Sequence, residues 1–92
     1  MAEELQSQPD NRALEMAAYI QSQFVRRPGV QVSPDTPLVS SGLIDSFALI
    51  EIFLKLEHVT SRKIPASKVQ AKDMDTVQLM LATAERIGKP RQ

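Results

Sequence analysis

Apolar residues recur every three or four positions between Arg12 and Arg26, which is the spacing of one face of an α-helix. The residues at that spacing are Leu14, Ala17, Ala18, Gln21, Phe24 and Val25, and of these Gln21 alone is polar. Asp10 or Asn11 can cap the start of this helix, because each carries a side-chain oxygen that accepts a hydrogen bond from a free backbone N–H. A proline–glycine pair at 28–29 ends it. The pattern therefore predicts a first helix over residues 12–26.

A long connection without a helical period follows, from Val30 to about Ile44. It contains prolines at positions 34 and 37 and six isolated apolar residues, Val30, Val32, Leu38, Val39, Leu43 and Ile44. A loop of this length without structure of its own is uncommon in a compact domain. We therefore expect its apolar residues to pack across the helices.

The second helix is predicted from Asp45-Ser46 to about Val59. Two neighbouring apolar stripes run along it, one made of Leu49, Ile52, Phe53 and Leu56 and the other of Phe47, Ile50 and Leu54. The polar side and its margins carry Glu51, Lys55, Glu57 and His58. A helix that is apolar over so wide an arc is either buried on more than one side or presents apolar surface to partners.

The remainder of the chain predicts one short and one longer helix. Residues 66–71 are expected to form one or two short helical turns. Asp75 is predicted to cap the last helix, with Gln78 three residues later as its reciprocal partner. Gly88 is the predicted stop of that helix. The expected fold class is all-α, a four-helix bundle of three main helices and one short helix with a long first loop, in one domain over residues 10–89.

Composition narrows the possible classes of function. The 92 residues are 42% hydrophobic but 4% aromatic, which favours an aliphatic helical core over a strand-rich sandwich. The chain has no cysteine, so disulfides and cysteine-based metal sites are excluded. Basic and acidic residues balance at 11 each, so the positive excess of a typical nucleic-acid-binding domain is missing.

The first nine residues are polar and without a period, and they are predicted to form a disordered tail. They have neither the basic nor the apolar region of a secretory signal. No apolar run approaches the roughly 20 residues needed to span a bilayer. We therefore expect a cytoplasmic protein with neither a membrane nor a nucleic acid as partner.

The segment with chemical content is Ser41-Gly42-Leu43-Ile44-Asp45-Ser46-Phe47. Taken alone, its Asp-Ser pair predicts an ordinary helix N-cap. The segment resembles the phosphopantetheine attachment site of acyl carrier proteins, in which a glycine stands three residues before an Asp-Ser pair and an apolar residue follows. The resemblance extends over residues 12–88. A first helix, a long loop, the serine at the head of the second helix, an Ile-Pro pair, a short helix and an Asp-Thr-Val start to the last helix follow in family order.

The resemblance implies that a phosphopantetheinyl transferase attaches a 4′-phosphopantetheine arm to Ser46, with Asp45 helping to orient the magnesium of that reaction. The phosphodiester is anionic, and a helix N-terminus offers it free N–H groups and the positive end of the helix dipole. The thiol of the arm would hold the cargo as a thioester. The chain would then be no enzyme but a carrier on which other enzymes act.

Carrier proteins of this type dock on their enzymes through the second helix. By resemblance, the expected partner-contacting residues are Leu43, Ile44, Phe47, Glu51 and Glu57. The positions that would line an acyl pocket between the second and third helices are Phe53, Leu56, Ile64 and Val69. Because Phe53 is bulky, we expect poor sequestration of long acyl chains. The implied partners are the transferase, an adenylating or acyltransferase loading enzyme and later pathway enzymes, each bound transiently by a monomer.

The charge of the chain departs from that of the family. Many carriers of fatty-acid synthesis are strongly acidic, whereas this chain is neutral. Basic residues stand in a region where the family tends to carry acids, namely Arg62, Lys63, Lys68 and Lys72. We therefore expect a dedicated carrier in a specialised biosynthetic pathway, of polyketide, fatty-acid-like or related type.

Two alternatives stay open. One is an aminoacyl or peptidyl carrier of a nonribosomal-peptide-type pathway, since stand-alone aminoacyl carriers also use an Asp-Ser site. The other is an unmodified helical adaptor, in which Ser46 is a helix cap and nothing more. An enzyme built on a Ser–His pair is implausible, because His58 stands twelve residues further along the same predicted helix, about 18 Å from Ser46.

Overall fold

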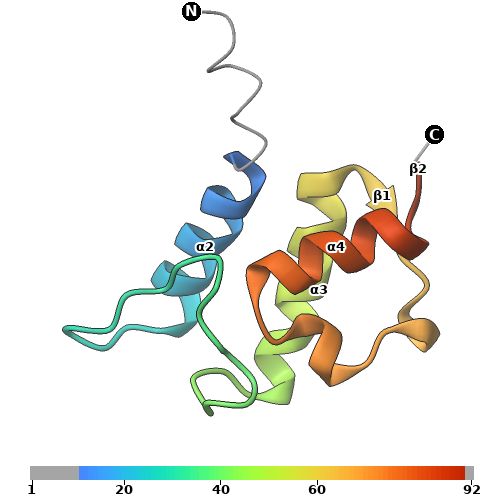
Figure 1. Cartoon of the computed structure of the whole chain (residues 1–92). Coiled ribbons are helices and arrows are strands. Elements are labelled where there is room, and N and C mark those ends of the chain that lie inside the picture. The colour runs from blue at the N-terminus through green and yellow to red at the C-terminus, as the bar shows by residue number, and fades with distance from the viewer. Residues whose placement is uncertain (1–10, 91–92) are drawn as a thin grey trace, which may run out of the picture.

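The computed structural model describes residues 11–90, and both the predicted tail over residues 1–9 and the candidate cap Asp10 lie outside the described residues. Three helices, α2 (Asn11–Phe24), α3 (Ser46–Thr60) and α4 (Val77–Ile87), pack together, with a long loop joining α2 to α3 (Figure 1). The predicted fold class, a mainly helical bundle with a long first loop, is confirmed.

Each helix buries one face in a common apolar core. The largest fully buried side chains are Met16, Ile20, Leu38, Ile52, Leu56, Ile64, Met80 and Val77. On α2 the predicted face was rotated, because Leu14 is 57% exposed whereas Ala13, Met16 and Ile20 are buried. Residues 13, 16, 17 and 20 follow the i, i+3, i+4, i+7 spacing of a buried face, so the core contact of α2 lies one position away from the one expected.

Short elements connect α3 to α4 and close the chain. The one or two short helical turns expected over residues 66–71 are present as two 3₁₀ turns, η1 (Ala66–Lys68) and η2 (Ala71–Met74), the second of which continues past residue 71. Two-residue strands β1 (Arg62–Lys63) and β2 (Lys89–Pro90) pair antiparallel, with Lys63 opposite Lys89. The strand pair, which the sequence pattern did not predict, joins the segment after α3 to the segment after α4.

The polar residue on the apolar side of α2 has a structural role. The Gln21 side chain donates a hydrogen bond to the carbonyl of Val30 and accepts one from the amide of Val32, with an N–O distance of 2.7 Å for the second. The Gln21 amide thereby satisfies backbone groups at the start of the long loop, next to the buried Val32 side chain. This contact fixes the first part of the loop against α2.

Asp75 holds the middle of the long loop. One carboxylate oxygen accepts hydrogen bonds from the amides of Leu38, Val39 and Ser40 at 3.2, 2.8 and 2.8 Å. The other accepts from the Ser40 hydroxyl at 2.8 Å. The prediction that Asp75 caps α4 was therefore wrong. The cap is Thr76, whose side chain accepts from the Leu79 amide, so the neighbouring carboxylate is available to the loop.

Glu57 holds the segment that leaves α3. Its side chain is 6% exposed, and its carboxylate accepts a hydrogen bond from the amide of Ile64 at 2.8 Å. α3 ends at Thr60, after which Ser61 turns the chain in a left-handed conformation with φ 54°. The turn leads the chain back past the last turn of α3, and Glu57 satisfies a backbone donor that is buried there.

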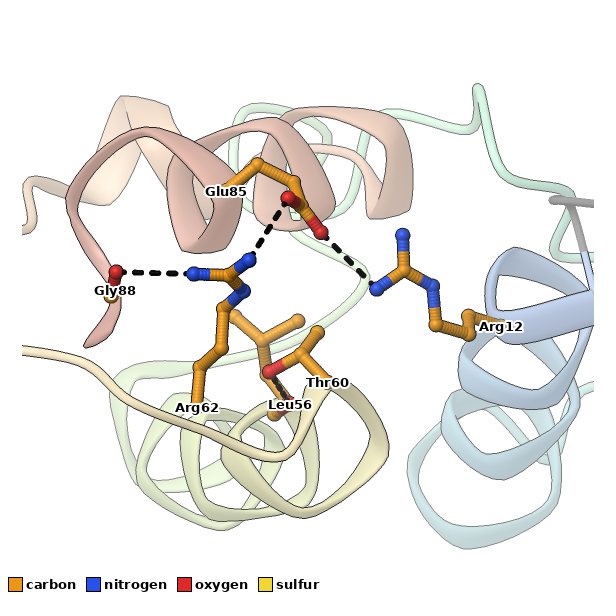
Figure 2. A network of polar contacts seen from close by, with 6 residues as sticks. All are labelled: Arg12, Leu56, Thr60, Arg62, Glu85 and Gly88. Carbon is orange, nitrogen blue, oxygen red and sulfur yellow. Dashed lines mark hydrogen bonds and ion pairs between the residues drawn. The ribbon is translucent and has the colours of Figure 1, made fainter. Parts of the chain in front are cut away.

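A small ionic network joins the start of α2, the end of α4 and strand β1 (Figure 2). Glu85 on α4 accepts from Arg12 on α2 at 3.1 Å and from Arg62 on β1 at 3.3 Å. Arg62 also donates to the carbonyl of Gly88 at 3.1 Å. Exposed ion pairs contribute little to stability, so the packing of these segments depends mainly on the apolar core and not on this network.

The hydrogen bonds between Asp75 and the loop predict how the stability of the domain depends on pH. The Ser40 amide, followed by the Ser40 hydroxyl and the amides of Val39 and Leu38, lowers the pKa of Asp75 below its ordinary value of 3.8, although burial opposes this. A folded-state pKa that is depressed adds stability at pH values above the unfolded pKa, and that stability is lost as the pH falls through the folded pKa.

We expect Asp75→Ala to lower the free energy of unfolding by about 1–3 kcal/mol at neutral pH, measured by urea denaturation. The difference from wild type should shrink as the pH falls below 3.8. Asp35→Ala, which removes an exposed carboxylate from the same loop, is the matched control. A difference that stays constant with pH would show that the charge of Asp75 contributes nothing.

The buried hydrogen bond of Glu57 leads to a second prediction about stability. Glu57→Ala should lower the free energy of unfolding by about 1–3 kcal/mol, because the buried amide of Ile64 loses its acceptor. Glu57→Gln keeps an acceptor oxygen and should lose less. Glu51→Ala, on an exposed part of the same helix, should change stability by less than about 0.5 kcal/mol. Equal losses at positions 51 and 57 in urea denaturation would contradict this role of Glu57.

Candidate functional site

Ser46 is the first residue of α3, and its side chain is exposed. The residue before it, Asp45, is the N-cap of the helix, with an extended backbone and a carboxylate that accepts from the amide of Ala48 at 2.9 Å. The prediction that this pair heads the second main helix is confirmed. The hydroxyl of Ser46 thus lies at the end of α3 where the first backbone N–H groups have no partner within the helix.

The turn that precedes Ser46 is held in place by its own backbone. The carbonyl of Leu38 accepts from the amides of Leu43 and Ile44 at 3.0 and 3.2 Å. Gly42, which directly precedes Leu43 in this turn, has a φ of +80°, a conformation that favours glycine. Ile44 is 7% exposed and anchors the turn in the core. Ser46 therefore follows a segment that is fixed from Leu38 onward.

An apolar surface begins next to Ser46. Phe47, Ile50 and Leu54 are 80%, 60% and 57% exposed and lie on one side of α3. We refer to these three residues as the α3 stripe. Exposure of large apolar side chains is costly when they lie together, and such patches mark contact surfaces on many proteins. The stripe gives α3 one buried face and one apolar face that is free in this chain.

A hollow of about 410 Å³ adjoins the α3 stripe, between α3 and the η1–η2 segment. Its lining is mostly apolar and consists of Leu49, Ile50, Phe53, Leu54, Ala66, Val69, Gln70, Ala71 and Met74. Of the four predicted pocket residues, Phe53 and Val69 line this hollow. Leu56 and Ile64 do not, because they are 1% and 2% exposed and pack in the core.

The predicted docking residues divide into two groups. Phe47 and Glu51 are exposed on α3, and Leu43 is half-buried in the turn before it. Ile44 and Glu57 are buried, so the free chain presents little of either residue for the predicted partner contact. Ile44 fills the core below the turn, and Glu57 is occupied by the amide of Ile64.

The described residues place few other reactive or metal-binding side chains near Ser46. Within residues 11–90, no group of three or more His, Cys, Asp or Glu side chains is placed to hold a metal ion. None of the helices in that range is long and apolar enough to cross a membrane. Another hollow beside the serine is lined by Asp45, Phe47, Glu51 and Phe24, among others. The site is thus an exposed hydroxyl flanked by one carboxylate and an apolar surface.

Sequence reasoning missed the residues that hold this site in place. Asp75, between η2 and α4, and Gln21, on α2, bind the backbone of the loop, and neither was assigned to it. A signal was present, because a loop whose apolar side chains are buried needs partners for its amides, and side chains are the usual source where no strand lies alongside. Comparisons with protein-family models, with curated proteins and with solved structures found no match to this chain.

Proposed function

We propose that this chain is a stand-alone acyl carrier protein, which carries acyl groups as thioesters on a 4′-phosphopantetheine arm attached to Ser46. The observation that carries the proposal is the exposed hydroxyl of Ser46 at the first residue of α3, directly after an Asp N-cap and a fixed turn. A modifying enzyme needs such a hydroxyl to be accessible. It also benefits from a fixed one, because a preformed geometry costs less to bind.

The residues around Ser46 fit the phosphodiester of the arm. An anionic group on the hydroxyl meets the positive end of the α3 dipole and its first N–H groups. The carboxylate of Asp45 stands in the adjacent position and would repel the anion unless a cation lies nearby. This is a physical reason for Asp45 to act with magnesium during attachment, in addition to capping α3.

The arm supplies a terminal thiol, which this cysteine-free chain does not have. The chain itself supplies position and surface. The exposed apolar side chain of Phe47 and the exposed carboxylate of Glu51 lie within five residues of Ser46 and form the proposed contact surface for partner enzymes. The adjoining hollow, with Phe53 and Val69 in its lining, is the proposed place for the apolar part of a cargo.

We place this carrier in the cytoplasm, in a specialised biosynthetic pathway. An aminoacyl or peptidyl carrier is the alternative within the same class, and the two differ in the cargo that an adenylating enzyme loads. A helical adaptor is the alternative from another class. It receives support from the α3 stripe, because an exposed apolar face also suits a protein that binds partners without modification.

The first test is covalent modification of Ser46. We expect co-expression with a broad-specificity phosphopantetheinyl transferase to raise the intact mass by one phosphopantetheine. Ser46→Ala should abolish the rise, whereas Ser67→Ala, at another exposed serine, should leave it unchanged. An unmodified mass with several active transferases would contradict the proposal and favour the adaptor. A rise that survives in Ser46→Ala would also contradict the proposal, because the arm would then be attached to another residue.

The second test separates the two roles of Asp45. Asn caps a helix about as well as Asp, so Asp45→Asn should change the unfolding free energy by less than about 0.5 kcal/mol. Its modification should be at least about tenfold slower, because the charge beside the hydroxyl is lost. Initial rates of modification and urea denaturation measure the two effects. A wild-type rate in Asp45→Asn would leave capping as the role of this residue.

A further inference from the structure

A second hollow, of about 540 Å³, lies at the other end of α3 from Ser46. It is lined by residues of β1, η1, the last turn of α4 and β2, of which β1, β2 and the end of α4 lie near the end of α3 (Figure 1). The cationic residues of its lining are Lys63, Lys68, Arg86 and Lys89, and Pro65 and Ile87 contribute apolar surface. We call this region the basic hollow. Among residues 11–90, no carboxylate lines it.

The charges of the basic hollow are poorly compensated. Within residues 11–90, Arg86 approaches Asp73 at 3.9 Å, while Lys63, Lys68 and Lys89 have no acidic group within 4.0 Å. Lys63 and Lys89 stand directly opposite each other in the β1–β2 register. Like charges in directly opposed strand positions destabilise a sheet. The fold therefore concentrates positive charge here although doing so costs stability.

Protection of strand edges accounts for part of this arrangement. Lysine on a short edge strand discourages pairing with other chains, which explains Lys63 and Lys89. The same reason does not apply to Lys68 or Arg86, which come from η1 and α4 and face the same hollow. Four short segments, β1, η1, the end of α4 and β2, thus bring cations to one concave surface. Such a surface matches a partner that is negatively charged.

We propose that the basic hollow binds an acidic segment of a partner protein. Its concave shape suits an inserted peptide, whereas an anionic bilayer is best met by apolar side chains that project from a helix face. The described part of the chain places no aromatic ring in its lining on which bases could stack, which disfavours single-stranded nucleic acid. Pro65 and Ile87 offer apolar contact to a side chain between two carboxylates. The expected ligand is therefore an extended segment of acidic residues with an apolar residue among them.

This surface is separate from the proposed attachment site. The fifteen residues of α3 lie between Ser46 and β1, which corresponds to about 20 Å of helix. A partner segment bound in the basic hollow therefore leaves the hydroxyl of Ser46 uncovered. The inference does not depend on the modification of Ser46, since it rests on the charges at the opposite end of the helix.

The test uses a fluorescently labelled synthetic peptide of glutamates with a central leucine, and measures its anisotropy against the full chain at low salt. Combining Lys63→Gln, Lys68→Gln and Lys89→Gln should weaken binding by about tenfold or more. The control removes the same charge elsewhere, with Arg26→Gln, Arg27→Gln and Lys72→Gln, and should weaken binding by less than about twofold. Urea denaturation should find the first variant at least as stable as wild type, because Lys63 no longer opposes Lys89.

Three outcomes would overturn the proposal. The first is no binding of the peptide by the wild-type chain at low salt. The second is an equal loss in both triple variants, because binding would then follow net charge and not the hollow. The third is tighter binding of anionic phospholipid vesicles or of a single-stranded oligonucleotide than of the peptide, which would assign the surface to a membrane or a nucleic acid.

Discussion

The carboxylate of Asp75 is the contact on which the candidate site depends. It accepts hydrogen bonds from the amides of three successive loop residues, 38–40, and the backbone carbonyl of Asp75 also accepts from the amide of Leu38 at 2.7 Å. With that segment fixed, the carbonyl of Leu38 is in position to hold the turn that leads through Ile44 to Asp45. The exposed serine at the head of α3 is therefore placed by a residue that lies between η2 and α4, far from the serine in sequence.

α3 divides the surface of the domain into two ends with different chemistry. At its start lie a free hydroxyl, one carboxylate and the apolar α3 stripe. At its end, the buried Glu57 turns the chain back, and the segments that follow bring together the cations of the basic hollow. The core between the ends is aliphatic and closely shared by the three helices. A chain with no net charge thus has a distinctly uneven distribution of charge.

Periodicity predicted the helices well, because burial of a continuous face repeats along the chain and leaves a regular trace. It predicted the polar residues less well. Asp75 and Thr76 are neighbours that both suit an N-cap, and the choice between them depends on loop amides brought in from residues 38–40. Glu57 stands on the margin of the polar side, and its burial depends on where the chain turns after Ser61. A strand of two residues is too short to show an alternation of apolar and polar positions, so the sequence pattern could not predict the β1–β2 pair.

The span between Asp75 and its loop also bears on the order in which the domain forms. The contacts join positions that are 35 to 37 residues apart, and such contacts close late because the intervening chain must be ordered first. During synthesis, α2, the loop and α3 are all made before residue 75 exists. The serine is therefore present on the growing chain before the turn behind it is fixed. The last part of the domain to be synthesised thus governs when the turn before the exposed serine takes its final form.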